Sequence, residues 1–311
     1  MLGLFKKSGK LKGLVGVSVD ATGIAVAHIE GSSADKIQLK ACEYGECQGA
    51  KAQLEVLTQQ VNKMGLQGAS ANFILSPSQY SLLLIEPPEV PEEELTQAVR
   101  WRIKDLVDFN VNEAALDIVR LPADAFRGRQ QMIYVVAAAR AVVDAAEDLV
   151  NNAGMQLKYI DVAETSLCNL LNGFDTESHG CALMFLKRGE GIVNLVKNHS
   201  LYLTRRIKAD LTAVDPQELA SSNAFNHLLL ETQRSLDYYE SQLGQIPATE
   251  LLLLPVGELG GALGDALNAN LGLNAHMLNL PEYLPGAEAL SMEFQHQCLL
   301  AIAAGLRREA L

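Results

Sequence analysis

Few side chains in this chain combine the residue types and the spacing that catalysis or metal binding requires. The segment Ser76-Pro77-Ser78 does not match the GxSxG turn that presents a nucleophilic serine. Glu92–Glu94 follow Pro91, and acids at such a place are typical of a solvated helix N-terminus. No two histidines form an HxxxH or HxH pair that could hold a metal ion; they are His28, His179, His199, His227, His276 and His296. We therefore predict neither a metal centre nor a nucleophilic triad.

The five cysteines are odd in number, scattered and mostly set among apolar neighbours; they are Cys42, Cys47, Cys168, Cys181 and Cys298. Cys42 and Cys47 lie five positions apart, which is not the spacing of a redox or zinc CxxC pair. This pattern indicates buried free thiols in a reducing compartment.

Composition favours a protein of two lobes. The chain has 311 residues, of which 49% are hydrophobic and only 5% aromatic. Small aliphatic residues in this number suit α/β packing, and the length favours two cores over one. The net charge is −12, and no long basic stripe is present. A nucleic-acid binder is therefore not expected.

The N-terminus carries four lysines in an otherwise acidic chain: Lys6, Lys7, Lys10 and Lys12. The apolar run that follows, residues 14–19, is too short for a signal peptide, and no stretch approaches the roughly 18 apolar residues of a membrane span. We expect a soluble cytoplasmic protein. The lysines form either a mobile tail or a peripheral contact with anionic lipid, at about 1 kcal/mol per basic residue.

The first part of the chain predicts a β-meander followed by a helix. Residues 14–19 and 24–29 are apolar runs joined by a turn that contains glycine, which indicates a hairpin. A third strand at 37–43, a helix at 51–64, and short strands at 71–75 and 80–85 follow.

Three prolines, Pro87, Pro88 and Pro91, mark the edge of an inserted subdomain. Its pattern predicts the order α-β-β-α over about residues 88–155, with a helix at 92–107, strands at 115–121 and 131–138, and a helix at 141–153 that Gly154 ends.

The opening pattern recurs later in the chain. Strands at 181–187, 192–197 and 201–207 again form a meander, and a long helix at 223–243 follows. Two halves that begin alike indicate an internal duplication. The polar segment 172–180 divides the predicted lobes, residues 1–172 and residues 173–311.

This order of elements resembles the actin-like ATPase superfamily, and particular segments resemble its PilM branch, the cytoplasmic type IV pilus assembly proteins related to FtsA. Within the branch, the chain is most similar to MshI proteins of mannose-sensitive haemagglutinin pili. The segments that carry the resemblance are 4–7 with 14–17 (LFKK, LVGV), 94–101 (ELTQAVRW), 153–155 with 160–162 (AGM, IDV), 230–239 (LETQRSLDYY) and 303–308 (AAGLRR). The resemblance implies a duplicated α/β fold of the actin-like (ribonuclease H-like) class, with two lobes and an α-β-β-α subdomain inserted in the first.

The resemblance also implies two glycine-rich hairpins that hold ATP phosphates, each with an acid that holds Mg²⁺. In the first hairpin, Ser18 falls where the acid should be and Asp20 falls where the glycine should be. Shifting the alignment by two residues restores the acid at Asp20 but puts Thr22 in place of the glycine. Asp20, Thr22 and Gly23 are therefore cofactor-binding residues only if nucleotide binding survives.

The other family positions are also altered. Phe185-Leu186-Lys187 falls on the expected Asp-apolar-Gly, although Gly189 remains as a turn residue. The family also has a third glycine-rich turn, with a Gly-Gly run after a strand. Here only Gly257 stands close behind the corresponding strand, and Gly260-Gly261 are displaced. Glu231 and Arg234 match positions that line the family's pocket, and structural ion pairing is an equal alternative for them. We expect no magnesium-dependent hydrolysis, while weak ATP binding aided by Lys187 stays open.

The resemblance implies a binding role instead. In PilM proteins, a groove between the first lobe and the inserted subdomain holds the cytoplasmic N-terminal segment of a PilN-like membrane protein. Arg100, Trp101 and Arg102 are the candidate partner-binding residues, with Trp101 favoured as a core residue and an interface as the alternative. The expected function is a non-catalytic scaffold at the cytoplasmic face of the inner membrane. The alternatives are an ATP-binding switch and, less favoured, an actin-like sugar kinase or unrelated enzyme, and dimerisation stays open.

Overall fold

The computed structural model describes residues 11–31, 37–126, 131–171, 179–187, 189–211 and 214–307. The predictions for Lys6, Lys7 and Lys10, and most of the predicted boundary at 172–180, lie outside these residues.

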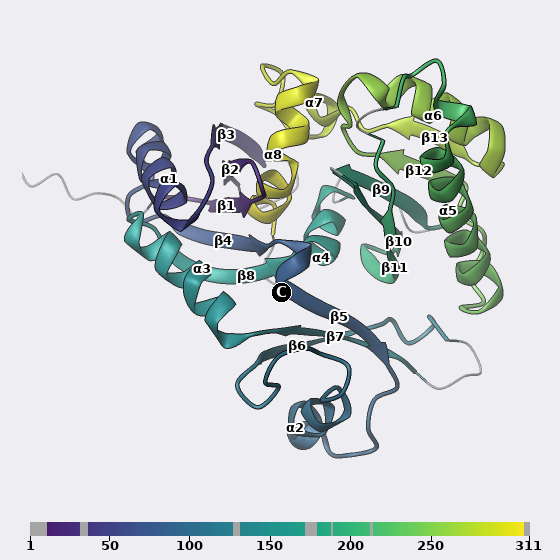
Figure 1. The fold of residues 1–311 in the computed structure, drawn as a ribbon, viewed down its shortest axis with the longest axis horizontal. Helices are drawn as coiled ribbons and strands as arrows, with labels where there is room; N and C mark the ends of the chain where they lie inside the picture. Colours follow the sequence, from purple (N-terminus) through teal and green to yellow (C-terminus); the bar gives the residue numbers. More distant parts are fainter. Residues whose placement is uncertain are drawn as a thin grey trace, which may run out of the picture.

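The first sheet has the strand order β3-β2-β1-β4-β8. β1 (Leu14–Val19), β2 (Gly23–Glu30) and β3 (Gln38–Glu46) form the predicted antiparallel meander. β4 (Ser70–Leu75) and β8 (Gln156–Val162) add to it in parallel. Helices α1 (Ala50–Met64) and α3 (Arg140–Asn152) pack against this sheet and against each other (Figure 1).

The second sheet repeats this topology in the order β11-β10-β9-β12-β13. Its strands are β9 (Cys181–Lys187), β10 (Glu190–Lys197), β11 (Ser200–Lys208), β12 (Glu250–Leu253) and β13 (Asn274–Met277). Each sheet therefore has a three-stranded meander whose first strand lies in the centre and pairs in parallel with a later strand. The predicted duplication is confirmed.

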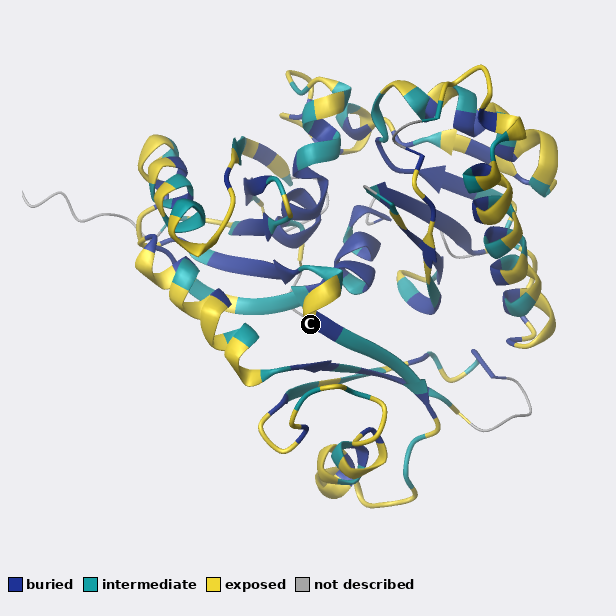
Figure 2. Cartoon of the chain, viewed as in Figure 1, coloured by how far each residue is buried: buried dark blue, intermediate teal, exposed yellow. Residues whose placement is uncertain are grey.

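The helices of the second half include α5 (Asn223–Ser241), α6 (Gly260–Leu271) and the short α7 (Leu280–Tyr283). α5 packs on β10 and β11, and α6 packs on β13. Figure 2 shows that the outer faces of α1, α3 and α5 are exposed, whereas the central strands of the two large sheets, such as β4 and β9, are buried. Strands covered on both faces read as nearly continuous apolar runs, which is why β9 and β10 were recognisable in the sequence.

The inserted subdomain differs from the prediction in the helices and strands that form it. A third sheet has the order β5-β7-β6, formed by β5 (Tyr80–Ile85), β7 (Ile133–Ala138) and β6 (Ala115–Arg120). α2 (Glu92–Arg102) lies on it, so β5 belongs to the subdomain, and α3 packs on the first sheet instead. The subdomain is therefore β-α-β-β, because local pattern does not reveal which sheet a strand joins.

The last helix, α8 (Met292–Gly305), lies in the residue range predicted for the second lobe but packs against β1, β2 and β4 of the first sheet. The approach is close, because a Cβ on Gly16 would lie 1.8 Å from the Ala301 carbonyl oxygen. Small residues along α8 allow this contact. No described helix is both long and apolar enough to span a bilayer.

We expect Gly16→Ala to lower the free energy of unfolding by about 1–3 kcal/mol, because the added methyl group forces α8 away from β1. Urea denaturation followed by circular dichroism measures this change. Gly261→Ala is the control, since a Cβ there meets no atom within 4 Å. Equal stability of the two variants would contradict the close packing of α8.

Candidate functional site

The two meanders bring corresponding turns together in a cleft between the lobes. The β1–β2 turn, the β9–β10 turn, the segment after β12 and the first turns of α8 surround a cavity of about 450 Å³. Five of the predicted cofactor-binding residues line it: Asp20, Thr22, Lys187, Gly189 and Gly257. Gly189 and Gly257 have φ values of 82° and 71°, a conformation that glycine adopts without strain.

Asp20 organises the first turn through its carboxylate. Its Oδ1 accepts hydrogen bonds from the Thr22 amide at 2.7 Å, the Thr22 hydroxyl at 2.7 Å and the Gly23 amide at 3.0 Å. Such a turn is a common use of aspartate beside glycine. Gly23 does not line the cavity, and a Cβ there would lie 2.5 Å from both the Gly45 carbonyl oxygen and the Tyr44 hydroxyl.

The other carboxylate oxygen of Asp20 crosses the cleft. Lys187 Nζ lies 2.6 Å from Asp20 Oδ2, and the two side chains are only 16% and 24% exposed. Burial raises the pKa of Asp20, but the positive charge and hydrogen bond of Lys187, with the Thr22 hydrogen bonds, outweigh it and lower the pKa to about 2. The Asp20 carboxylate is therefore ionised at pH 7.

A second cavity, of about 460 Å³, lies on the other side of this ion pair. Asp20 and Lys187 line both cavities. The second cavity is also lined by Ser18, Ser76, Ser78 and Arg206. The ion pair therefore divides the cleft into two spaces of similar volume.

Asp20 does not offer a free carboxylate oxygen to a bound Mg²⁺ ion. A magnesium site needs carboxylate oxygens that are free to face the metal. Both oxygens of Asp20 are already engaged, one by its own turn and one by Lys187. Within the described part of the chain, no group of three or more His, Cys, Asp or Glu side chains is arranged to hold a metal ion.

Sequence reasoning missed three cavity residues on α8, which are Glu293, His296 and Gln297. His296 Nδ1 lies 2.6 Å from the Pro255 carbonyl oxygen, and burial lowers the pKa of the ring. The ring is therefore neutral at pH 7, with Nδ1 as the donor. No sequence motif near these residues indicates a binding site, because α8 reaches the cleft only through its packing on the first sheet.

Two predicted cofactor residues lie elsewhere. Glu231 and Arg234 are on α5 and line neither cavity. Glu231 accepts from Arg205 at 3.2 Å and from Arg234 at 2.5 Å, so the structure places both in an ion-pair cluster on the second lobe. This arrangement is the alternative that the sequence had left open.

The three predicted partner-binding residues differ in their surroundings. Arg100 is structural, since its Nη1 donates to the Val111 carbonyl and, at 2.9 Å, to that of Ala114. Arg102 is half-exposed and lies 3.8 Å from Glu86. Trp101 is 61% exposed, so favouring it as a core residue was wrong. The buried face of α2 is formed by Leu95 and Val99, and Trp101 points away from it.

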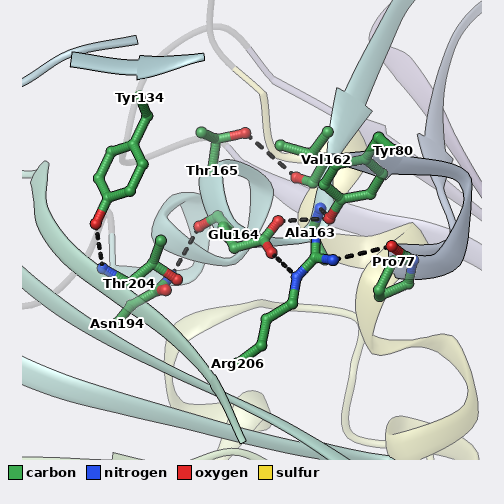
Figure 3. A network of polar contacts seen from close by, with 10 residues as sticks. All are labelled: Pro77, Tyr80, Tyr134, Val162, Ala163, Glu164, Thr165, Asn194, Thr204 and Arg206. Atoms are coloured by element: carbon green, nitrogen blue, oxygen red, sulfur yellow. Dashed lines mark hydrogen bonds and ion pairs between the residues drawn. The ribbon is translucent and has the colours of Figure 1, made fainter. Parts of the chain in front are cut away.

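A buried ion pair beside the cleft was not predicted at all (Figure 3). Glu164, in α4 (Ala163–Leu167), is 0% exposed, and its Oε1 accepts from Arg206 Nε at 2.6 Å. Its Oε2 accepts from the Tyr80 hydroxyl at 2.5 Å, and Arg206 Nη1 donates to the Pro77 carbonyl at 2.9 Å. The network joins the first lobe, the second sheet and the subdomain.

We expect Asp20→Asn, which keeps an oxygen for the turn, to lower the free energy of unfolding by about 2 kcal/mol at pH 7. The folded pKa lies below the unfolded value, so the stabilisation is complete above about pH 5 and disappears as pH falls towards 2. Denaturation of both proteins between pH 7 and pH 2.5 measures this. A difference that stays constant down to pH 2.5 would contradict the ionised pair.

Comparisons with known proteins identify the fold. No family model and no curated protein matches the chain. A chain of the PilM–PilN type IV pilus biogenesis complex superposes with a TM-score of 0.72 at 19% identity, over 96% of this chain and 98% of that one. A Bacteroides thetaiotaomicron protein of unknown function with an actin-like ATPase fold superposes with a TM-score of 0.54 at 9% identity, over 95% of this chain and 100% of that one. Together with the duplicated sheets, these matches show that the chain has the actin-like ATPase fold.

Proposed function

We propose that the chain is a non-catalytic docking scaffold of a type IV pilus assembly complex, at the cytoplasmic face of the bacterial inner membrane. The likeness to a chain of the PilM–PilN complex, over nearly the full length of both chains, supports this class of function. The finer assignment, to the MshI proteins of mannose-sensitive haemagglutinin pili, rests on the sequence resemblance alone.

The state of Asp20 is the observation that carries the non-catalytic role. Hydrolysis of ATP on an actin-like fold needs a carboxylate that holds Mg²⁺ at the phosphates. Here the Asp20 carboxylate is satisfied by three hydrogen bonds and an ion pair. In the other alignment of the first hairpin, Ser18 stands where the family has the acid. A metal ion would have to displace Lys187 from Oδ2 or break the hydrogen bonds of the turn at Oδ1.

The proposed partner is the cytoplasmic N-terminal segment of a PilN-like membrane protein. The proposed docking region is the inserted subdomain, with α2 and the sheet of β5, β6 and β7 beneath it. Trp101 is the most exposed of the large apolar side chains in the described part of the chain, and exposed tryptophans are over-represented among residues that dominate binding energy. Arg102 beside it is available for a polar contact at the rim.

An ATP-binding switch is the second candidate. It is favoured by one observation, the convergence of both hairpin turns and Gly257 on a single cavity of about 450 Å³. Lys187 is the side chain that would offset phosphate charge, at the cost of its bond to Asp20. The presence or absence of a magnesium requirement separates the two candidates.

Titration calorimetry of the purified chain with ATP is expected to show no binding that depends on Mg²⁺, because no free carboxylate faces the cleft at Asp20. The titration is run with Mg²⁺ and with EDTA, and phosphate release is measured in parallel. Binding strengthened tenfold or more by Mg²⁺, or hydrolysis abolished by Asp20→Ala, would favour the switch.

Trp101→Ala is expected to weaken binding of a synthetic peptide with the PilN-like N-terminal sequence by about tenfold or more, since loss of a central aromatic anchor typically costs 2 kcal/mol or more. Arg102→Ala should have a smaller effect in the same direction. Leu230→Ala is the matched control, because Leu230 is an apolar residue that is 48% exposed on α5 and not part of the proposed docking region. Unchanged affinity in Trp101→Ala would exclude this face.

A further inference from the structure

The Asp20–Lys187 ion pair joins equivalent points of the two duplicated halves. β1 and β9 are the central strands of their sheets, and each is followed by the first hairpin turn of its meander. Asp20 directly follows β1, and Lys187 is the last residue of β9. The contact is thus made where the ends of the two central strands approach each other across the cleft.

Hydrogen bonds within the first lobe orient the Asp20 carboxylate independently of Lys187. Three hydrogen bonds to Oδ1 fix the carboxylate and leave Oδ2 directed at the opposite lobe. Thr22, which supplies two of them, is itself held by the Tyr44 hydroxyl at 2.9 Å. A carboxylate held in this way loses little freedom when the ion pair forms, which separates it from the flexible surface pairs that contribute almost nothing.

The space around the pair is hollow. The pair lines cavities of about 450 Å³ and 460 Å³, and elsewhere the two lobes are joined by a shared buried core that includes Ile74 and Phe185. Arg206, which forms a second ion pair between the lobes with Glu164, also lines the second cavity. The buried network forms a fixed joint there, and the Asp20–Lys187 pair is the contact that closes the cleft above it.

We propose that Asp20 and Lys187 form a built-in latch that holds the two lobes closed without any ligand in the cleft. A ligand that bridges the two hairpin turns would close such a cleft by binding both. Here a side chain from each turn performs that bridging directly. The lobes therefore keep one arrangement whatever the ligand concentration, as a docking scaffold requires. The latch concerns the conformation of the isolated chain and does not depend on the identity of the partner.

The test is backbone hydrogen exchange, read by mass spectrometry, on the full chain. Lys187→Gln removes the positive charge from the second lobe, and Asp20→Asn removes the negative charge while it keeps an oxygen for the turn. We expect Lys187→Gln to accelerate exchange about tenfold in the β1–β2 turn, in the opposite lobe, because a charge-assisted hydrogen bond that closes the cleft is lost. A purely local role of Lys187 would change only the β9–β10 hairpin.

The double variant makes the test quantitative. If the two side chains act only through each other, the double variant should exchange no more than about threefold faster than either single variant, because the second substitution removes nothing further. Independent effects that multiply, or unchanged exchange in the β1–β2 turn of Lys187→Gln, would overturn the latch.

Lys63→Ala is the matched control. Lys63 forms an ion pair of 2.8 Å with Glu43 within the first lobe, so it should leave exchange in both hairpins unchanged. Peptide binding by Lys187→Gln then separates the two proposals. If Lys187→Gln exchanges faster in the β1–β2 turn but still binds the peptide, the cleft is mobile in the variant and the docking proposal is supported. If exchange shows the latch but the chain binds no peptide, the docking proposal alone is contradicted.

Discussion

A fully buried carboxylate is the constraint that fixes how the three parts of this molecule meet. Glu164 has no exposed surface, so its charge must be satisfied inside the protein. Its two oxygens are bound by Arg206 from the second sheet and by Tyr80 from the subdomain (Figure 3). Arg206 also stacks on the Tyr80 ring, 4.5 Å from its centroid. Removing any of the three side chains leaves a buried polar group unpaired, which makes this junction a single cooperative unit.

The duplicated topology explains why the cleft lies where it does. Both sheets place their first strand in the centre. The hairpin turns that follow these two strands therefore occupy equivalent positions, and both line the same cavity. α8, from the second half of the chain, packs on the first sheet, and its residues Glu293 and His296 line the cavity. The arrangement of the two sheets in the actin-like ATPase fold is therefore present in this chain.

The chemistry at that geometry has changed. At the place where two turns converge, the chain has an aspartate whose carboxylate is consumed by its own turn and a lysine that neutralises it. The two opposite charges attract each other across the cleft, so the residues that meet there do not repel one lobe from the other.

Local pattern was sufficient for much of the fold. The two meanders, the long α5 helix and their repetition followed from apolar runs separated by turns, because strands covered on both faces need continuous apolar sequence. The departure of Ser18, Asp20 and Lys187 from the actin-like motif was equally readable, since it depends only on residue identity. The exposure of Trp101 was also within reach, because Leu95 and Val99, four residues apart, define a buried face that excludes it.

Tertiary structure alone decided the rest. The sequence shows that Asp20 and Lys187 are both abnormal, but only the packing of two distant hairpins makes them partners. The sheet to which β5 belongs, the lobe that α8 covers and the burial of Glu164 likewise depend on contacts between segments far apart in the chain. Periodicity records which face of an element is apolar, and it carries no information about which distant element covers that face.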